Sequence, residues 1–281
     1  MITYDKFEEV ENDIKDKTPS IIYKYRTWED NWHKKIITDR EVWFAHPHTL
    51  NDPFDVRPPL NYIVGKVDWD KVKTKLMIAG RQLNLNLTRA ELETEVEKRL
   101  QDMKEDPIAY YTNSNKNYIL DSNNYDNIGV FSCCSSFDNE PMWAHYGNNH
   151  CGFSVGFNTI ELSKTLDKCV FDFVEYNDTP IDYHILGDVE NSDSYVSNLF
   201  RKSTKWKVEE ELRFIAIGID VINKRAEVFP VNAVEEIIFG INTSQKTQDE
   251  IIKQATLSLP NIPFYKLETK SSSYGFDKVK L

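Results

Sequence analysis

Several short segments of the chain are runs of apolar residues rich in β-branched and aromatic side chains, separated by polar segments. Runs of this kind are typical of strands. On this pattern we expect strands at residues 20–25, 42–46, 128–134, 151–157, 169–176, 211–217, 226–231, 235–240 and 263–267. The chain is therefore predicted to build a sheet from short strands.

The apolar spacing changes to every third or fourth residue between about residues 66 and 120, as on one face of a helix. Two such faces are predicted: Val72, Leu76, Ala79 and Leu83, and then Leu92, Val96, Leu100 and Met103. Thr88 and Glu91 have the spacing of a capping box at the start of the second helix. This stretch interrupts a strand-rich chain, so we predict an inserted helical lobe, which is either a lid over a cleft or a solvated ornament.

Shorter helices are predicted where capping residues precede an apolar spacing. They are expected from Thr27 with Asp30, after Asp138 with Pro141 in the first turn, near 192–204, and from Thr247 with Glu250. The last of these helices lies between the strands predicted at 235–240 and 263–267, in the order of a βαβ unit.

These elements predict an α+β fold: a mixed, mostly antiparallel sheet with a helical insertion at residues 66–120. The 281 residues exceed the usual size of one compact domain, but sheet-and-helix domains of this length are common, so we expect a single domain over residues 1–281. With 40% hydrophobic and 12% aromatic residues the chain can form a sizeable core.

The net charge of -11, from 34 basic and 45 acidic side chains, argues against broad contact with a phosphate backbone and leaves room for a local basic groove. The start of the chain is acidic and lacks an apolar segment, and no run approaches the roughly 18 apolar residues of a membrane span. We therefore expect a cytoplasmic protein without a membrane partner.

Metal binding is not predicted. The four cysteines, at 133, 134, 151 and 169, lack the paired spacing of a zinc site, and His46-Pro-His48 has no third ligand nearby. No phosphate-binding glycine loop, nucleophile elbow or metalloprotease motif occurs either.

Two glutamates are the first candidates for chemistry. In Trp206-Lys-Val-Glu-Glu-Glu-Leu-Arg213, a strand that began at Glu209 would turn Glu209 and Glu211 to one face. Two such carboxylates could stabilise a developing cation, and their repulsion would raise one pKa toward neutrality. Arg213 continues the same face, so a structural ladder of ion pairs is the alternative.

A second candidate group lies in Met142-Trp-Ala-His-Tyr146. His145 can act as a base or hydrogen-bond donor near neutral pH, while Trp143 and Tyr146 offer flat rings on which nicotinamide or adenine could stack. The alternative is that these side chains are ordinary core or surface residues.

Seven blocks in this order resemble the bacterial family known as domain of unknown function 2971, over nearly the whole chain outside the helical lobe. The blocks are Tyr23-Lys-Tyr-Arg26, Trp43-Phe-Ala-His46, Asn51-Asp-Pro-Phe54, Phe131-Ser132, Met142-Trp-Ala-His-Tyr146, Gly152-Phe153 and Trp206-x-x-Glu-x-Glu-x-Arg213. The name of that family carries no activity.

A more distant resemblance is to ADP-ribosyltransferases, which carry an arginine, a serine strand and a late Glu-x-Glu. It implies a split sheet, binding of NAD by Arg26 and Ser132, stabilisation of the ribose cation by Glu211, and orientation of the acceptor by Glu209. The serine block here reads Ser-Cys-Cys-Ser, which departs from the Ser-Thr-Ser of that family, and His145-Tyr146 has no fixed place in the pattern.

The leading expectation is thus an NAD-consuming, ADP-ribosyltransferase-like enzyme that acts as a bacterial toxin or antiphage defence effector. The acceptor is either a protein or a nucleic acid, and the sequence does not decide between them. An antitoxin or other partner protein is a further possibility. One alternative is a nuclease in which Glu209, Glu211 and Asp52 hold Mg²⁺. Another is a non-catalytic binding module whose polar clusters belong to the core.

Overall fold

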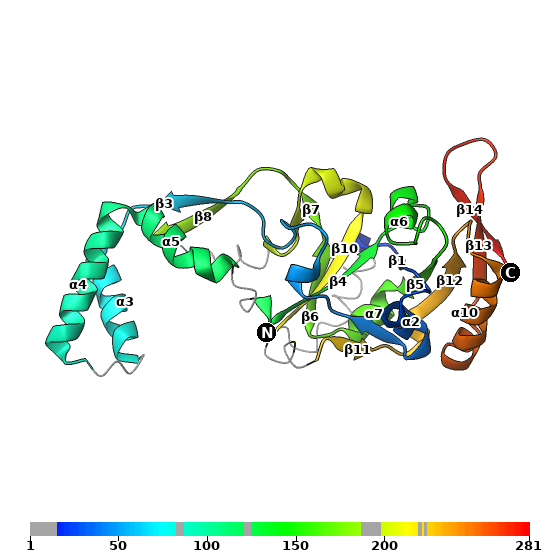
Figure 1. Ribbon diagram of the computed structural model, residues 1–281, viewed down its shortest axis with the longest axis horizontal. Coiled ribbons are helices and arrows are strands. Elements are labelled where there is room, and N and C mark those ends of the chain that lie inside the picture. The colour runs from blue at the N-terminus through cyan, green and yellow to red at the C-terminus, as the bar shows by residue number, and fades with distance from the viewer. Residues whose placement is uncertain (1–15, 83–86, 121–124, 187–197, 219–220, 222–223) are drawn as a thin grey trace. The chain divides into compact units, whose positions relative to one another are not determined.

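The computed structural model describes residues 16–82, 87–120, 125–186, 198–218, 221 and 224–281. The chain divides into two compact units (Figure 1). Unit 1 consists of Met1–Asp55, Tyr125–Asn177 and Phe200–Leu281, and unit 2 of Val56–Asn124 and Asp178–Leu199. The helical insertion expected at 66–120 lies within unit 2. The assignment of the whole chain to one domain stays a prediction.

Most regular elements of the described chain belong to unit 1. Its strands are β1 (Ile21–Arg26), β2 (Glu41–Trp43), β4 (Ile128–Cys134), β5 (Phe153–Asn158), β6 (Cys169–Phe173), β7 (Glu175–Tyr176), β9 (Arg201–Lys202), β10 (Glu211–Ile217), β11 (Ala226–Val228), β12 (Val234–Phe239), β13 (Phe264–Thr269) and β14 (Phe276–Lys280). Its helices are α2 (Asn31–Thr38), α6 (Glu140–His145), α7 (Thr159–Thr165) and α10 (Gln245–Ser258), with 3₁₀ turns η2 (Pro47–Thr49), η4 (Thr204–Glu209) and η5 (Val231–Ala233).

Eight of these strands form one sheet in the order β14-β13-β12-β5-β1-β4-β10-β6 (Figure 1). All neighbours in it are antiparallel except β12 and β13, which are parallel and are joined through α10. The predicted α+β class, the mostly antiparallel mixed sheet and the βαβ order near the end of the chain are confirmed.

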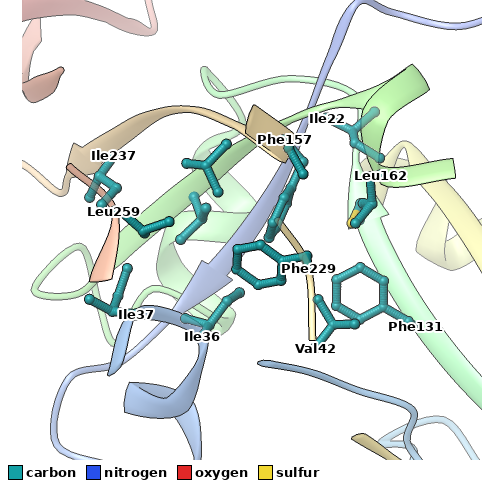
Figure 2. Close-up of a cluster of buried hydrophobic side chains, with 14 of the residues drawn as sticks. Ile22, Ile36, Ile37, Val42, Phe131, Phe157, Leu162, Phe229, Ile237 and Leu259 are labelled. Atoms are coloured by element: carbon teal, nitrogen blue, oxygen red, sulfur yellow. The ribbon is translucent and has the colours of Figure 1, made fainter. Parts of the chain in front are cut away.

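Side-chain alternation gives the sheet two buried faces. On one face, residues of β1, β5 and β12 pack with α2, α7 and α10 in a large apolar cluster (Figure 2). It includes Ile22, Phe157 and Ile237 of the sheet together with Ile37 and Leu162 of the helices. On the opposite face a smaller cluster joins Tyr23, Tyr25 and Ile238 to Trp143 of α6, among others. The sheet therefore lies between two layers.

Unit 2 combines helices with a parallel pair of strands, β3 (Leu60–Val64) and β8 (Ile181–Leu186). Its helices are α3 (Trp69–Gln82), α4 (Arg89–Glu105) and α5 (Pro107–Leu120). The predicted face of α4 is confirmed, because its four apolar residues are buried, and so is the capping box at Thr88. The face predicted for α3 is only partly right: no residue of α3 is fully buried, Ala79 is exposed, and Leu83 lies outside the described residues.

Three predicted helix caps are wrong by one to three residues. The Asp30 carboxylate itself accepts from Trp32 N at 2.7 Å, so Asp30 begins α2 instead of Thr27. Asn139 caps α6 because Asp138 is occupied elsewhere, accepting from Phe276 N at 2.5 Å. Ser244 caps α10 and accepts from Thr247 N at 3.2 Å.

The helix predicted near 192–204 is wrong over the part that can be compared. Residues 192–197 lie outside the described residues, residues 201–202 form β9, and a 3₁₀ turn begins only at Thr204. The strands β3, β8 and β14 were not predicted at all.

Candidate functional site

A cavity of about 540 Å³ opens in unit 1 beside β1, β2, β4 and the corner between η4 and β10. Its volume lies in the ordinary range of small-molecule sites. The cavity is lined by six residues that the sequence had singled out: Arg26, Ser132, His145, Tyr146, Glu209 and Glu211.

Three of these residues come from neighbouring strands. Arg26 ends β1, Ser132 is in β4, and Glu211 begins β10; β1 pairs with β4, and β4 pairs with β10. In register, Ser132 lies opposite Arg213, two residues from Glu211, so the side chains of Ser132 and Glu211 can meet on one face. The Ser132 hydroxyl helps to lower the pKa of the Glu211 carboxyl, so the two side chains lie close together.

Glu209 and Glu211 converge, but not by strand alternation. Glu209 ends the 3₁₀ turn η4, and Glu210 has left-handed backbone angles, φ 46° and ψ 49°, before β10 begins. Such angles in a residue other than Gly mark a sharp local turn that the surroundings must hold. Here Glu210 O accepts from Ser135 N at 3.0 Å, and the exposed Glu210 carboxylate accepts from Ser135 Oγ at 3.1 Å.

Five charged side chains form a buried ion cluster, none of them more than 8% exposed: Asp55, Lys202, Glu209, Glu211 and Arg213. All of them except Arg213 line the cavity. The Lys202 ammonium lies 2.5 Å from Glu209 Oε2, 3.0 Å from Asp55 Oδ2 and 3.3 Å from Glu211 Oε2.

Arg213 binds Glu211 through two bonds, Nε to Oε1 at 2.7 Å and Nη2 to Oε2 at 2.9 Å. Its Nη2 also lies 2.8 Å from Asp55 Oδ1. Paired bonds of this kind are among the stronger charge-assisted contacts. The pairing of Arg213 with Glu211, expected as a structural alternative, is therefore present.

The predicted rise in pKa is wrong for Glu211. Burial does raise the pKa of this carboxyl, but the charges of Arg213 and then Lys202 outweigh burial, and the pKa of Glu211 stays well below its usual range. The repulsion between two carboxylates is relieved because cations lie between them. Glu211 is therefore a fixed anion at neutral pH.

Tyr146 connects the ion cluster to the open part of the cavity. Its hydroxyl donates to Glu209 Oε1 at 2.6 Å and accepts from Asn51 Nδ2 at 2.9 Å. Burial, followed by the charge of Glu209, raises the pKa of Tyr146. On the far side, Tyr176 OH accepts from Glu211 N at 2.9 Å. No motif or spacing in the chain indicated the roles of Tyr176 and Lys202.

Trp143 does not offer a ring to the cavity. Its side chain is fully buried, donates from Nε1 to Phe137 O at 2.8 Å, and meets Tyr25 edge-on with ring centroids 4.9 Å apart. It points to the sheet because α6 packs its apolar side there, whereas His145 on the other side of α6 is exposed and lines the cavity. The tryptophans that do line the cavity are Trp32 and Trp43.

Basic side chains of β1 form a second wall of the cavity. Lys24 donates to Ser132 O and lies 4.8 Å from the centre of the Phe131 ring. Burial and then the charge of Arg26 lower the pKa of Lys24 to about 7. Burial also lowers the pKa of Arg26, to about 10. Among the residues that the structure describes, no carboxylate forms an ion pair with either cation, so this wall suits an anionic ligand.

No group of three His, Cys, Asp or Glu side chains in the described part of the chain is placed to hold a metal ion. The three carboxylates of the ion cluster surround the Lys202 ammonium instead. His46 bonds Asp126 at 3.1 Å and stacks on His48 with ring centroids 5.5 Å apart. Asp52, the third acid of the nuclease alternative, accepts from Phe54 N at 2.9 Å in the predicted turn.

Comparison with known proteins gives one match. Residues 142–214 match the model of a family described as protein of unknown function (DUF2971). The matched segment includes Tyr146, Glu209, Glu211 and Arg213, as the sequence resemblance to this family led us to expect. No curated protein and no solved structure matches the chain, so no ADP-ribosyltransferase appears among the matches. Within the described residues, no helix has the length and apolar character needed to cross a membrane.

Proposed function

We propose that unit 1 is an NAD-consuming enzyme of the ADP-ribosyltransferase type, with its reaction in the cavity described above. The observation that supports this most is the position of Arg26, Ser132 and Glu211. These residues lie on adjacent strands and line one cavity of ligand size, and Ser132 contributes to the lowered pKa of Glu211. These are the three residues to which the resemblance assigns NAD binding and stabilisation of the ribose cation.

The chemistry of the cavity is consistent with this reaction. The bond between ribose C1′ and the nicotinamide nitrogen breaks with its electron pair going to nicotinamide, which leaves a cation with oxocarbenium character. A carboxylate that is ionised and held in place before the reaction stabilises that charge without reorganising. Glu211 meets both conditions, since its two oxygens are held by Arg213 and Lys202.

The acceptor then supplies an electron pair to C1′ and loses a proton. Glu209, which is held by Tyr146 and Lys202, would orient this nucleophile, and the exposed His145 would take up the proton. The proposal includes an acceptor that is a protein or a nucleic acid. It also includes a role as a toxin or antiphage effector that a partner protein silences.

Nicotinamide release tests the proposal. Purified full-length protein is incubated with NAD and a bacterial cell extract, and nicotinamide is measured by chromatography. Wild type is expected to release nicotinamide. Glu211→Gln and Arg26→Gln are each expected to lower the rate of nicotinamide release at least tenfold. Glu210→Gln is the matched control, because this neighbouring glutamate is exposed and lies outside the ion cluster.

Arg26→Gln separates loss of activity from loss of folding, since Arg26 takes no part in the ion cluster; its thermal unfolding should match that of wild type. The proposal fails if wild type neither binds NAD nor releases nicotinamide, or if both folded variants release it like wild type.

A second candidate is a non-catalytic binding module, and the completeness of the ion cluster favours it. Each of its five charges has at least one oppositely charged partner within 3.3 Å, as in a structural polar network. On this alternative Glu211→Gln lowers thermal stability and leaves every measured ligand affinity unchanged. The nuclease alternative has no comparable support, because Lys202 lies where its carboxylates would hold a metal.

A further inference from the structure

We infer that the mouth of the cavity is a nucleobase subsite formed by Trp32 and Trp43, and that the ligand is a small nucleotide whose phosphates bind the cationic wall beside it. This inference uses the same cavity as the proposed function and names two residues and a ligand class for it. It concerns binding only, so it does not depend on cleavage of NAD.

The two tryptophans are exposed to an unusual degree for so large an apolar side chain. Trp32 is 70% exposed and Trp43 is 48% exposed, yet both line the cavity, so they lie where it opens. Their ring centroids are 6.3 Å apart, with the planes tilted by 46°. Such a pair leaves ring surface in contact with water, and a planar base would cover it.

A positive charge lies close to these rings. Lys35 Nζ is 4.9 Å from the centre of the Trp32 ring and 3.4 Å from the Glu41 carboxylate, which also lines the cavity. The lysine shields one part of Trp32 only, because most of that side chain remains exposed. The mouth therefore combines aromatic surface with a weakly paired cation.

Lys24 and Arg26 of β1 form the cationic wall, and His33, next to Trp32 in α2, lines the cavity beside them. Burial lowers the pKa of His33 to about 4, so its ring is neutral near pH 7. His33 Nδ1 is buried without a hydrogen-bond partner, and a buried polar atom of this kind is costly unless a ligand or water meets it. Lys24 and Arg26 provide the charge that a phosphate group requires.

The order of these features matches the parts of a nucleotide: aromatic rings at the mouth for the base, and cations farther in for the phosphates. Stacking on tryptophan does not select one base, since every base has a flat face. The net charge of -11 argues against a long nucleic acid, because a polyanion would meet repulsion outside the cavity. A mononucleotide or dinucleotide is small enough for its phosphates to contact only the cationic wall inside the cavity.

The test is calorimetric titration of the full-length protein with ADP-ribose, which has a base and two phosphates, and with ribose 5-phosphate, which has no base. Trp32→Ala and Trp43→Ala are each expected to weaken ADP-ribose binding roughly tenfold and to leave ribose 5-phosphate binding unchanged. Tyr274→Ala is the control, because Tyr274 is 97% exposed and lies outside the cavity.

The inference is overturned if wild type does not bind ADP-ribose at millimolar concentration, or if both tryptophan variants bind it like wild type. It is also overturned if a short single-stranded oligonucleotide binds more tightly than ADP-ribose. These outcomes are distinct from failure of the proposed enzyme, since ADP-ribose binding that depends on Trp32 and Trp43 can occur without any release of nicotinamide.

Discussion

The buried ion cluster makes Lys202→Met the most informative single change in the molecule. Lys202 is 3% exposed and faces Asp55, Glu209 and Glu211 within 3.3 Å. Without it, Asp55 and Glu211 keep Arg213, whereas Glu209 keeps, among the described residues, only its hydrogen bond from the hydroxyl of Tyr146. Removal of one partner from a buried ion pair costs about 3–5 kcal/mol, and we expect this loss in the free energy of unfolding.

The loss of stability in Lys202→Met should also depend on pH, in a direction that follows from the pKa of Glu211. In wild type the pKa of Glu211 is below its unfolded value of 4.5, so its contribution to stability is present above that pH and is lost as pH falls. In Lys202→Met, the carboxylates that have lost their cation can take up a proton as pH falls. The difference in stability between wild type and variant should therefore be largest near pH 7 and smaller near pH 5.

Urea unfolding followed by tryptophan fluorescence, at pH 7 and at pH 5, measures both effects. Lys224→Met is the matched control: Lys224 is 63% exposed and pairs with Glu227 at 2.9 Å, and an exposed pair contributes about 0–1 kcal/mol. The reasoning is refuted if Lys202→Met costs no more than Lys224→Met, or if its cost does not shrink at the lower pH.

Three further predictions concern the walls of the cavity and the core. Tyr146→Phe leaves Glu209 without its 2.6 Å hydrogen bond and should lower the free energy of unfolding by about 1–3 kcal/mol in the same urea experiment; a loss below about 0.5 kcal/mol would contradict it. Since the pKa of Lys24 is lowered to about 7, affinity for ADP-ribose should fall roughly tenfold between pH 6 and pH 8.5 in calorimetry, and Lys24→Arg should remove most of this fall; equal pH dependence in both proteins would contradict it. Burial raises the pKa of Cys133 to about 12, so iodoacetamide at pH 8 should label the exposed Cys151 and spare Cys133 in native protein, as read by mass spectrometry; equal labelling would be the contrary result.

The strands of the sheet could largely be read from the chain. Residues 128–134 and 211–217 were predicted with the bounds that β4 and β10 have, because a short run of mostly apolar residues is a local property of a strand buried on both faces. The short strand β14 was missed, since its five residues carry three charges and it is held mainly by pairing with β13.

The candidate site could be predicted only in part. Glu209 and Glu211 stood out by residue type, and Arg213 by spacing, but alternation gave the wrong reason for their convergence. The left-handed angles of Glu210 turn the chain at this point, and contacts with Ser135 help to hold that turn. No pattern within a few residues encodes such a corner, because the partner lies 75 positions away.

The sequence alone was sufficient to predict the α+β class, most of the strands, the helical face of α4 and the residue types of the site. All of these depend on neighbours within a few positions along the chain. The tertiary structure decided which charges pair. It brings Lys202, nine positions away, to Glu211, and it brings Asp55 from a distant part of the chain to Lys202 and Arg213. The cations next to Glu211 make it a fixed anion with a lowered pKa. Electrostatic interactions act through space and depend on burial, and neither the distances nor the burial can be obtained from spacing along the sequence.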